Sequence, residues 1–474
     1  MPASFVEHWK ITQDGMHGTM VLAQRGYDER TDLVLDDQLH SADGILQGRK
    51  WDQNSNGEIT YLRGIHHRSD VSAAALAALA PGVTLLGMLP GTQPAYVVRV
   101  DPPEGRLEYV YYDASTFFID RMDVALDGSR HIVTYDDYRR TGGHMLAWHV
   151  HTLDVHTGVQ DDRTLTSIDL DAVPDAAVAI PTASNPLVLS QSPAALPALI
   201  LSDRIILTVR IKGRAINLLL DSGASGIAID PGILDALRIP RFGASTGSMA
   251  GNYAVSRAVV PAIVLGSATL RNTLVEAIPF TQWGNDHTPI AGLVGFDFLD
   301  AAAYKIDYVN GTVTAMDAAS FTPPPGAYAQ PIALDDGVPV VGATIAQAVG
   351  EHFVLDTGAD RSVLYSQFVH DHPSSAADQG LGTQIRDAFP FETAFSGVGG
   401  RVSYHPVQVA PFTFAGVTFR NWLFDATYDA AGFEREDYDG LIGQDVLRYF
   451  DVYLDYPHSR IYFVPNARYT NRFG

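Results

Sequence analysis

The chain has 474 residues, 46% of them hydrophobic, and carries 54 acidic against 32 basic residues, a formal net charge of −22. This length and composition are typical of a globular protein with more than one core, and the negative charge disfavours binding to nucleic acid or to anionic membranes. Because there is no cysteine, disulfides, thiolate metal sites and cysteine nucleophiles are excluded.

Residues 1–171 are predicted to form a β-rich domain. Short alternating or aromatic segments such as PAYVVRVDPP, RLEYVYYDAS and SRHIVTYDDY are separated by Pro, Gly and Asp, a pattern typical of an antiparallel sheet curled around one apolar face. The apolar stretch 72–91 has about the length of a membrane span, but it is Ala-rich and broken by Pro81 and Gly82. It predicts a helix capped near Asp70, a turn and a buried strand, with no membrane span.

Two other features of this region resemble metal sites. The run that starts at Asp52 has the Asp-x-Asn-x-Asn-Gly rhythm of a calcium loop, but its twelfth position is Arg63, where such a loop needs Glu. A hairpin turn is expected instead. His149 and His151 alternate on one face of a predicted strand, yet no third and fourth ligand follow at the spacing of a zinc site. We therefore expect no metal ion and no cofactor.

The rest of the chain contains an internal repeat. Residues 172–199 are rich in Pro, Ala and Ser and predict a partly extended linker. Two halves follow, 200–325 and 326–474. In each half an apolar strand runs into Asp-Ser/Thr-Gly-Ala, and a later Gly-Leu-aliphatic-Gly block leads to an Asp-Tyr pair and a closing strand. Blocks that recur in the same order indicate duplicated structural units.

The two Asp-Ser/Thr-Gly motifs together indicate peptide hydrolysis. Two carboxyl groups in close proximity cannot both ionise, so one remains an acid while the other serves as a base. With Asp221 and Asp356 as such a pair, the ionised member takes a proton from a water molecule, and the protonated member donates to the scissile carbonyl oxygen. A pseudo-two-fold arrangement of the halves supplies one aspartate from each half.

The neighbouring residues are expected to support the catalytic loops. The glycine after each Asp-Ser/Thr pair allows a tight backbone turn, and the two hydroxyl side chains can hydrogen-bond across the pseudo-two-fold axis. The last glycine of each Gly-Leu-aliphatic-Gly block is expected to pack beneath the loop. The predicted supporting residues are Ser222, Gly223, Ala224, Thr357, Gly358, Ala359, Gly295 and Gly443.

On these motifs, residues 200–464 resemble the pepsin/retropepsin aspartic proteases, in particular the bacterial retropepsin-like group, with two halves fused in one chain. The resemblance implies a mainly β fold of duplicated double-ψ β-barrel halves, with Asp221 and Asp356 as the catalytic dyad. It also implies flexible hairpin flaps at the two glycine-rich turns. The flap candidates are Gly247, Gly251, Tyr253, Gly397, Gly400 and Tyr404.

Two motif positions, each present once in either half, depart from family patterns. Retroviral members follow the second glycine of the hydrophobic-hydrophobic-Gly motif with Arg, whereas this chain has Phe296 and Gln444, so Arg-based bracing of the two halves is not expected. Many pepsin-like enzymes have Ser or Thr at the positions of Ala224 and Ala359. Without that hydroxyl the carboxylate is less stabilised, so activity is expected at a milder pH than that of gastric-type enzymes.

The N-terminal region resembles the curved half-barrel of LolA-type lipoprotein carriers, through a Tyr-Asp-x-x-Thr strand end and a later Asp-Tyr-Arg segment. The resemblance implies an antiparallel half-barrel that holds a lipid or peptide ligand, or serves as an accessory to the protease. It also favours a periplasmic or secreted location, with a signal peptide absent from this sequence.

The predicted function is that of an aspartic endopeptidase that cleaves a peptide or protein substrate. Since both Asp motifs lie in one chain, a monomer suffices for activity. The alternative is a lipid- or peptide-binding protein built on an inactive protease-like scaffold.

Overall fold

The computed structural model describes residues 4–61, 68–103, 105–126, 129–170, 173–248, 251–280, 284–285, 288–335, 337–372, 393–397, 400–427 and 438–473. The fold is mainly β, as predicted. The chain divides into two compact units, one of residues 1–183 with Gly243–Thr246 and the other of residues 184–242 with 247–474.

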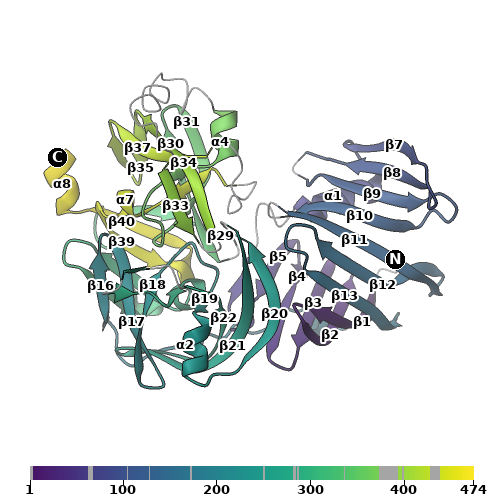
Figure 1. Ribbon diagram of the computed structural model, residues 1–474, viewed down its shortest axis with the longest axis horizontal. Coiled ribbons are helices and arrows are strands. Elements are labelled where there is room, and N and C mark those ends of the chain that lie inside the picture. The colour runs from purple at the N-terminus through teal and green to yellow at the C-terminus, as the bar shows by residue number, and fades with distance from the viewer. Residues whose placement is uncertain are drawn as a thin grey trace. The chain divides into compact units, whose positions relative to one another are not determined.

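The first unit is built on one antiparallel sheet in the strand order β6-β5-β4-β3-β2-β1-β13-β12-β11-β10-β9-β8-β7 (Figure 1). Most neighbours in this order are joined by short turns, as the punctuated sequence predicts. Its elements are β1 (Ser4–Gln13), β2 (Met16–Arg25), β3 (Asp28–Leu35), β4 (Leu39–Leu46), β5 (Arg49–Gln53), β6 (Ile59–Thr60), α1 (Arg68–Ala78), β7 (Val83–Leu89), β8 (Ala95–Val100), β9 (Glu108–Asp113), β10 (Ile119–Leu126), β11 (Ser129–Thr141), β12 (His144–Asp154) and β13 (Gln160–Asp169).

Two predictions about this unit can be compared with the structure. The run after Asp52 forms the turn of the β5–β6 hairpin, in which Asn54 Oδ1 accepts hydrogen bonds from the N–H groups of Asn56 and Glu58.

His149 and His151 lie on β12, and both contact the Asp162 carboxylate, at 3.2 and 3.0 Å. Among the residues that the structure describes, no group of three potential metal ligands gathers.

The prediction for the apolar stretch 72–91 is correct in its elements and wrong about burial. Helix α1, a turn and β7 follow one another as expected. However, β7 is an edge strand of the sheet, and Leu85, Leu86 and Met88 are 62%, 54% and 56% exposed. A run of apolar residues predicts a strand, but it does not show whether another element of the fold covers that strand. In the described part of the chain, no helix is long and apolar enough to cross a bilayer.

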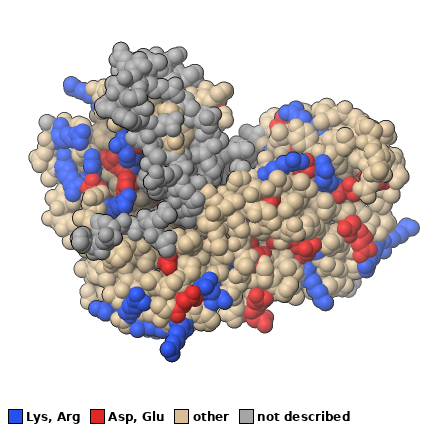
Figure 2. Space-filling view, in the orientation of Figure 1, with Lys and Arg blue, Asp and Glu red and all other residues tan. Residues whose placement is uncertain are grey.

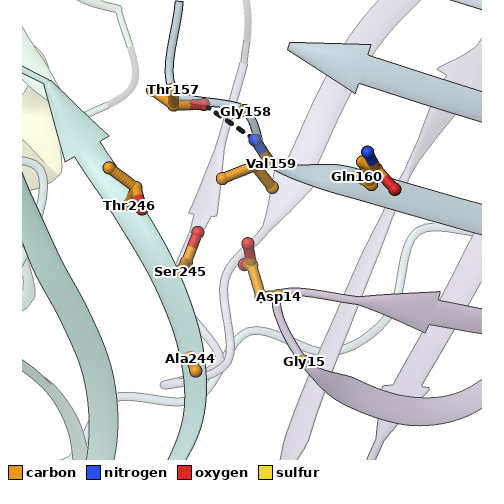
Figure 3. A pocket seen from close by; sticks show the side chains of 9 residues that line it. All are labelled: Asp14, Gly15, Thr157, Gly158, Val159, Gln160, Ala244, Ser245 and Thr246. Atoms are coloured by element: carbon orange, nitrogen blue, oxygen red, sulfur yellow. Dashed lines mark hydrogen bonds between the residues drawn. The ribbon is translucent and has the colours of Figure 1, made fainter.

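The first unit also has a polar pocket of about 280 Å³ (Figure 3). The turn between β1 and β2 and the turn before β13 line one part of it, and Ala244–Thr246 lines the other. In this region the N–H of Ala244 donates to the carbonyl oxygen of Asp14 at 2.7 Å.

The second unit contains a nine-stranded sheet, a ten-stranded sheet and a six-stranded sheet. The short helix η2 (Asp175–Ala177) lies in the first unit. The strands β14 (Leu187–Leu189) and β16 (Ala198–Leu201) lead into the first half, whose elements are β17 (Arg204–Ile211), β18 (Arg214–Leu220), β19 (Ile227–Ile229), α2 (Pro231–Ala236), β20 (Arg241–Ser248), β21 (Asn252–Leu265), β22 (Ala268–Ala277), β23 (Gly284–Asn285), β24 (Thr288–Pro289), β25 (Gly292–Val294) and α3 (Phe296–Leu299). Those of the second half are β29 (Ala333–Asp335), β30 (Val338–Ile345), β31 (Ala348–Leu355), β32 (Val363–Leu364), α4 (Ser366–Asp371), β33 (Thr393–Gly397), β34 (Gly400–Val409), β35 (Phe412–Phe414), β36 (Val417–Phe419), β37 (Trp422–Ala426), β38 (Gly440–Ile442) and α7 (Gln444–Leu447).

The six-stranded sheet combines strands from both halves in the order β15-β27-β26-β39-β40-β28. Its elements, with the helices beside them, are β15 (Ala194–Leu196), β26 (Ala303–Asp307), β27 (Thr312–Met316), η3 (Ala318–Ser320), β28 (Tyr328–Pro331), β39 (Phe450–Asp455), η4 (Tyr456–His458), β40 (Arg460–Pro465) and α8 (Ala467–Phe473). At its centre β26 pairs antiparallel with β39, from Ala303 opposite Asp455 to Asp307 opposite Asp451. These strands lead into the Asp-Tyr pairs of the two repeats, and each pairs on its other side with the closing strand of its own repeat, β27 or β40. The repeat therefore places equivalent strands side by side.

One large buried cluster extends from Ala194 to Phe463 and includes side chains of both halves and of the six-stranded sheet. The apolar strands that precede the two Asp motifs contribute to it. Leu218 and Leu220 on β18, and Phe353 and Leu355 on β31, are all fully buried. This core therefore anchors the strand end from which each aspartate projects.

Candidate active site

The two catalytic-loop candidates begin at equivalent places in the two halves. Asp221 follows β18, which pairs in parallel with β25, and Asp356 follows β31, which pairs in parallel with β38. The N–H of Asp221 donates to the Val294 carbonyl oxygen at 2.9 Å. The N–H of Asp356 donates to the Ile442 carbonyl oxygen at 3.0 Å. Both aspartates are thus held at the end of a buried parallel strand pair.

Reciprocal hydrogen bonds join the two loops. The N–H of Ser222 donates to Thr357 Oγ1 and the N–H of Thr357 donates to Ser222 Oγ, each at 2.9 Å. The hydroxyls then donate onward, Ser222 Oγ to Leu355 O at 2.5 Å and Thr357 Oγ1 to Leu220 O at 2.9 Å. Ser222 and Thr357 have no exposed surface, so each bond is made where an unpaired polar group would be costly.

These bonds bring the two carboxyl groups together. A methyl group added at Gly223 would lie 2.8 Å from Cγ of Asp356, and one added at Gly358 would lie 2.5 Å from Cγ of Asp221. Each glycine therefore faces the carboxyl group of the other half. Only a residue without a side chain permits this approach, which explains glycine at both positions.

Burial raises the pKa of both acids. Burial is the largest cause at Asp221, and the negative charge of Asp356 adds to it, so the pKa of Asp221 lies well above the ordinary value. Burial also raises the pKa of Asp356. Each of the two residues remains partly accessible to solvent, so a water molecule can reach the pair. Two adjacent acids of this kind bind one proton between them over a broad pH range.

The glycines of the two Gly-Leu-aliphatic-Gly blocks lie directly against the loops of their own halves. A methyl group at Gly295 would lie 2.2 Å from the Ala224 carbonyl oxygen, and one at Gly443 would lie 2.9 Å from the Ala359 carbonyl oxygen. The residues that follow these glycines, Phe296 and Gln444, donate their N–H groups to the same two oxygens. The blocks thus fix the back of each loop through the main chain.

The predicted flap residues occupy two hairpins. Gly247 lies near the end of β20, and the ring of Tyr253 on β21 covers it closely, 2.5 Å from an added methyl group. Gly251 immediately precedes β21. The residues 249–250 and 398–399, which lie at the predicted turns, are outside the described residues.

In the second hairpin Gly397 on β33 pairs with Gly400 on β34. Tyr404 is 6% exposed and packs in a cluster that includes Val340, Val363 and, at its edge, Ala359. The structure thus places Tyr404 inside a core next to the Asp356 loop, whereas the candidate tyrosine of the first hairpin packs over a glycine.

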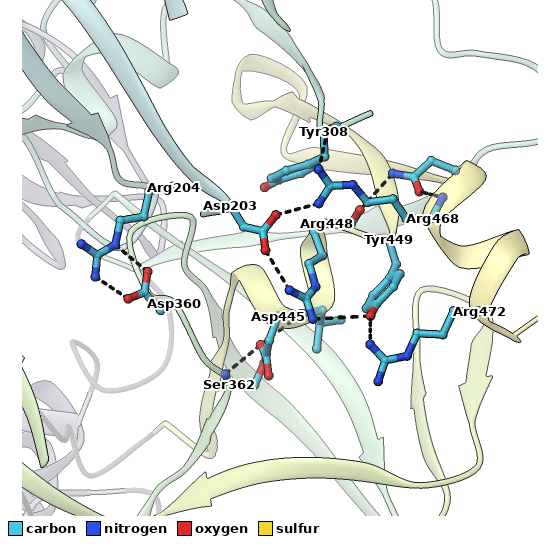
Figure 4. Close-up of polar contacts among 12 residues, drawn as sticks. Asp203, Arg204, Tyr308, Asp360, Ser362, Asp445, Arg448, Tyr449, Arg468 and Arg472 are labelled. Carbon is cyan, nitrogen blue, oxygen red and sulfur yellow. Dashed lines mark hydrogen bonds and ion pairs between the residues drawn. The ribbon is translucent and has the colours of Figure 1, made fainter. Parts of the chain in front are cut away.

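Sequence reasoning missed a set of ion pairs that join the halves (Figure 4). Arg204, at the start of β17, donates to Asp360 of the second catalytic loop through Nε at 2.7 Å, and its Nη2 contacts the other carboxylate oxygen. Asp203 accepts from Arg448 at 2.8 Å and from Arg468 at 2.6 Å. Positions 296 and 444 carry Phe and Gln, but arginines elsewhere in the chain brace the halves, so the expectation of no Arg-based bracing was wrong.

Buried acids lie behind both loops and were also missed. Burial raises the pKa of Asp300 to about 7, with a contribution from the charge of Asp297. Burial raises the pKa of Asp445 to about 6, although its Oδ1 accepts hydrogen bonds from the N–H and hydroxyl of Ser362. The Gly-x-Asp spacing in both repeats was the only sequence signal for Asp297 and Asp445.

Surface charge adds no further candidate site on the face shown in Figure 2. Acidic and basic side chains are interspersed there, and neither sign gathers into a continuous patch among the described residues.

Comparison with known proteins identifies an aspartyl-protease-like region. A family model described as aspartyl protease matches residues 207–298, which include the Asp221 loop and the block ending at Gly295. The comparison with curated proteins gave no match.

Solved structures resemble each part of the chain at low similarity. A LolA superfamily protein from Nitrosomonas europaea is 13% identical with a TM-score of 0.29, and the match covers 38% of this chain and 92% of that chain. Basic 7S globulin from soybean is 12% identical with a TM-score of 0.34, over 60% of this chain and 96% of that chain. Conglutin gamma from lupine seeds is 11% identical with a TM-score of 0.33, over 60% and 96%.

Proposed function

We propose that this protein is an aspartic endopeptidase in which Asp221 and Asp356 activate water for peptide-bond hydrolysis. The observation that carries the proposal is the pair of loops joined by the Ser222 and Thr357 hydrogen bonds, with each loop glycine against the opposite carboxyl group. Two fused retropepsin-like halves, one aspartate from each, are part of the proposal.

The geometry supports a direct attack by water. The monoprotonated pair contains one base and one acid on either side of the position where a water molecule and a carbonyl group can lie. The base removes a proton from the water, whose oxygen bonds to the carbonyl carbon, and the acid protonates the carbonyl oxygen. The resulting gem-diol collapses as the C–N bond breaks and the amide nitrogen receives a proton.

An inactive binding scaffold is the competing function. A binding scaffold does not require two acids that face each other. Burying such a pair destabilises the fold, and proteins retain such a costly arrangement mainly at functional sites.

The two hairpins that carry Gly247 and Gly400 are proposed to close over an extended peptide and exclude water. We further propose a periplasmic or secreted location, and a lipid- or peptide-holding role for the first unit.

Cleavage of a mixture of unfolded proteins tests the activity. The wild type is expected to generate peptides somewhere between about pH 3 and 8, a range that spans carboxyl and imidazole titration. The variants D221N and D356N are expected to fold and to lose cleavage. Full activity in either folded variant would contradict the dyad, and a wild type that cleaves nothing in this range would favour the binding scaffold.

A further inference from the structure

The two carboxyl groups of the proposed dyad are not in equivalent surroundings. Asp356 Oδ1 accepts two main-chain hydrogen bonds, from the N–H of Gly358 at 2.7 Å and from the N–H of Ala359 at 3.0 Å. In the described structure Asp221 Oδ1 accepts one main-chain hydrogen bond, from the N–H of Gly223 at 2.9 Å. The N–H that would supply a second, on Ala224, points instead to the main-chain oxygen of Asp221 at 3.3 Å.

Hydrogen bonds from N–H groups stabilise a carboxylate more than a neutral carboxyl group. The loop of the second half therefore favours the anion, while the loop of the first half favours it less. We propose that Asp356 is the general base of the pair and that Asp221 carries the shared proton and acts as the general acid. This assignment rests on the proposed function of the pair.

The other groups near the pair explain why it holds a proton. Tyr456 of η4 is buried close to both acids, and burial keeps its phenol neutral by raising its pKa well above the ordinary value. Asp300 is a further acid near that phenol. Neither Asp221 nor Asp356 has a cation among the groups that shift its pKa, so a shared proton reduces the charge of the pair.

The charged neighbour of Asp356 is Asp360, whose negative charge raises the pKa of Asp356. Arg204 forms a two-pronged ion pair with Asp360, which reduces the effect of that charge. The observation that separates the two acids is therefore the number of main-chain hydrogen bonds that each carboxyl group accepts.

In the reaction, Asp356 would take a proton from water as the water oxygen bonds to the carbonyl carbon. Asp221 would donate its proton to the carbonyl oxygen. During collapse, the proton held by Asp356 passes to the leaving nitrogen, and a gem-diol hydroxyl returns a proton to Asp221. The pair thus regains its starting protonation state, with no other reactant consumed.

The dependence of stability on pH tests the assignment without requiring activity. A group whose pKa is raised by folding contributes stability below its unfolded value, about 4 for Asp, and loses it as pH rises through the folded value. Of the pair, D221N leaves Asp356, whose carboxylate accepts two main-chain hydrogen bonds, whereas D356N leaves Asp221, whose carboxylate accepts one. Urea unfolding midpoints should be measured for both variants at intervals from about pH 4.5 to 7.5 and referred to the wild type.

The midpoint of D356N is expected to fall more steeply with rising pH than that of D221N. Equal slopes, or a steeper fall for D221N, would overturn the assignment. If an asparagine variant does not fold, serine at the same two positions provides a second pair. A wild type that folds but cleaves no peptide would contradict the proposed function, while the order of the slopes would still decide which acid holds the proton.

Discussion

At the scale of single residues, the candidate site depends on two hydroxyls and two glycines. Ser222 and Thr357 satisfy four main-chain groups across the halves, and Gly223 and Gly358 allow the carboxyl groups to approach. The side chains named by the Asp-Ser/Thr-Gly motifs are therefore those that build the pair.

Replacing Thr357 by valine should destabilise the fold and the site together. The change leaves the Ser222 N–H and the Leu220 oxygen without their partner in a buried place, at a cost of about 1–3 kcal/mol for each unpaired group. Thr357→Ser keeps the hydroxyl and is the matched control. Urea denaturation should show a loss of about 2 kcal/mol or more for valine and a much smaller loss for serine, and equal losses would contradict a role for the hydroxyl.

The pH–rate profile should have its maximum at a milder pH than unperturbed aspartates would give. Activity requires one proton on the pair, so it falls on the acid side when both acids are protonated and on the alkaline side when both ionise. Since the pKa values of Asp221 and Asp356 are both raised, the active window moves upward from about pH 4. Measured kcat/KM with a peptide substrate should decline below about pH 4, and a maximum below about pH 3 would refute this.

The identity of the paired acids could be predicted from sequence because the motif occurs twice, in register. Their inequality could not, since both loops read Asp-Ser/Thr-Gly-Ala and the orientation of the Ala224 N–H is set by the loop conformation. The buried position of Tyr456 could not be predicted either, because an Asp-Tyr pair before a closing strand does not show which way the phenol points.

At the scale of elements, the parallel pairs β18–β25 and β31–β38 position the loops, and ion pairs brace one half against the other. The turn between β16 and β17 carries Asp203 and Arg204 to the second half, where they meet α7, α8 and the Asp356 loop. This brace acts at the base of the second catalytic loop.

Arg204→Met should weaken the brace by a modest amount. The pair with Asp360 is bidentate but about one-third exposed, so a loss of about 1 kcal/mol is expected. A double-mutant cycle with Asp360→Asn, followed by urea unfolding at low and high salt, should give a coupling energy of that size that decreases with salt. Arg214→Met, at the exposed start of β18 in the same half, is the control, and a coupling energy near zero would contradict the brace.

Elements were predictable where periodicity and turn residues agree, as for the hairpin after Asp52 and for α1 with β7. Burial of β7 was predicted wrongly because exposure depends on which strand ends the sheet, and the local sequence does not specify that. The bracing arginines were missed for a similar reason. Each ion pair joins residues that are far apart in the chain. Only the packing of the halves brings Arg204 to Asp360, and Arg448 and Arg468 to Asp203.

At the scale of the whole molecule, the chain forms two compact units. The main core of the second unit lies within residues 194–463, whereas a separate cluster around Ala23, Val173 and Val178 belongs to the first. The match to the aspartyl protease family, residues 207–298, lies in the second unit except for Gly243–Thr246.

Residues 184–474 should therefore fold when produced alone, because their core includes no side chain of the first unit. Far-UV circular dichroism and a cooperative unfolding transition would verify the fold, and cleavage of unfolded proteins would verify that the site is complete. A molecule that folds only with residues 1–183 present would contradict this division.

The central claim is that Asp221 and Asp356 act as one catalytic unit, and peptide cleavage by D221N, D356N and the double variant tests it most directly. When two groups act as one unit, removing either abolishes the contribution of both. All three folded variants should therefore show the same loss of activity relative to wild type, and the second substitution should add no further loss. A single variant that retains activity, or losses that multiply in the double variant, would contradict a shared dyad.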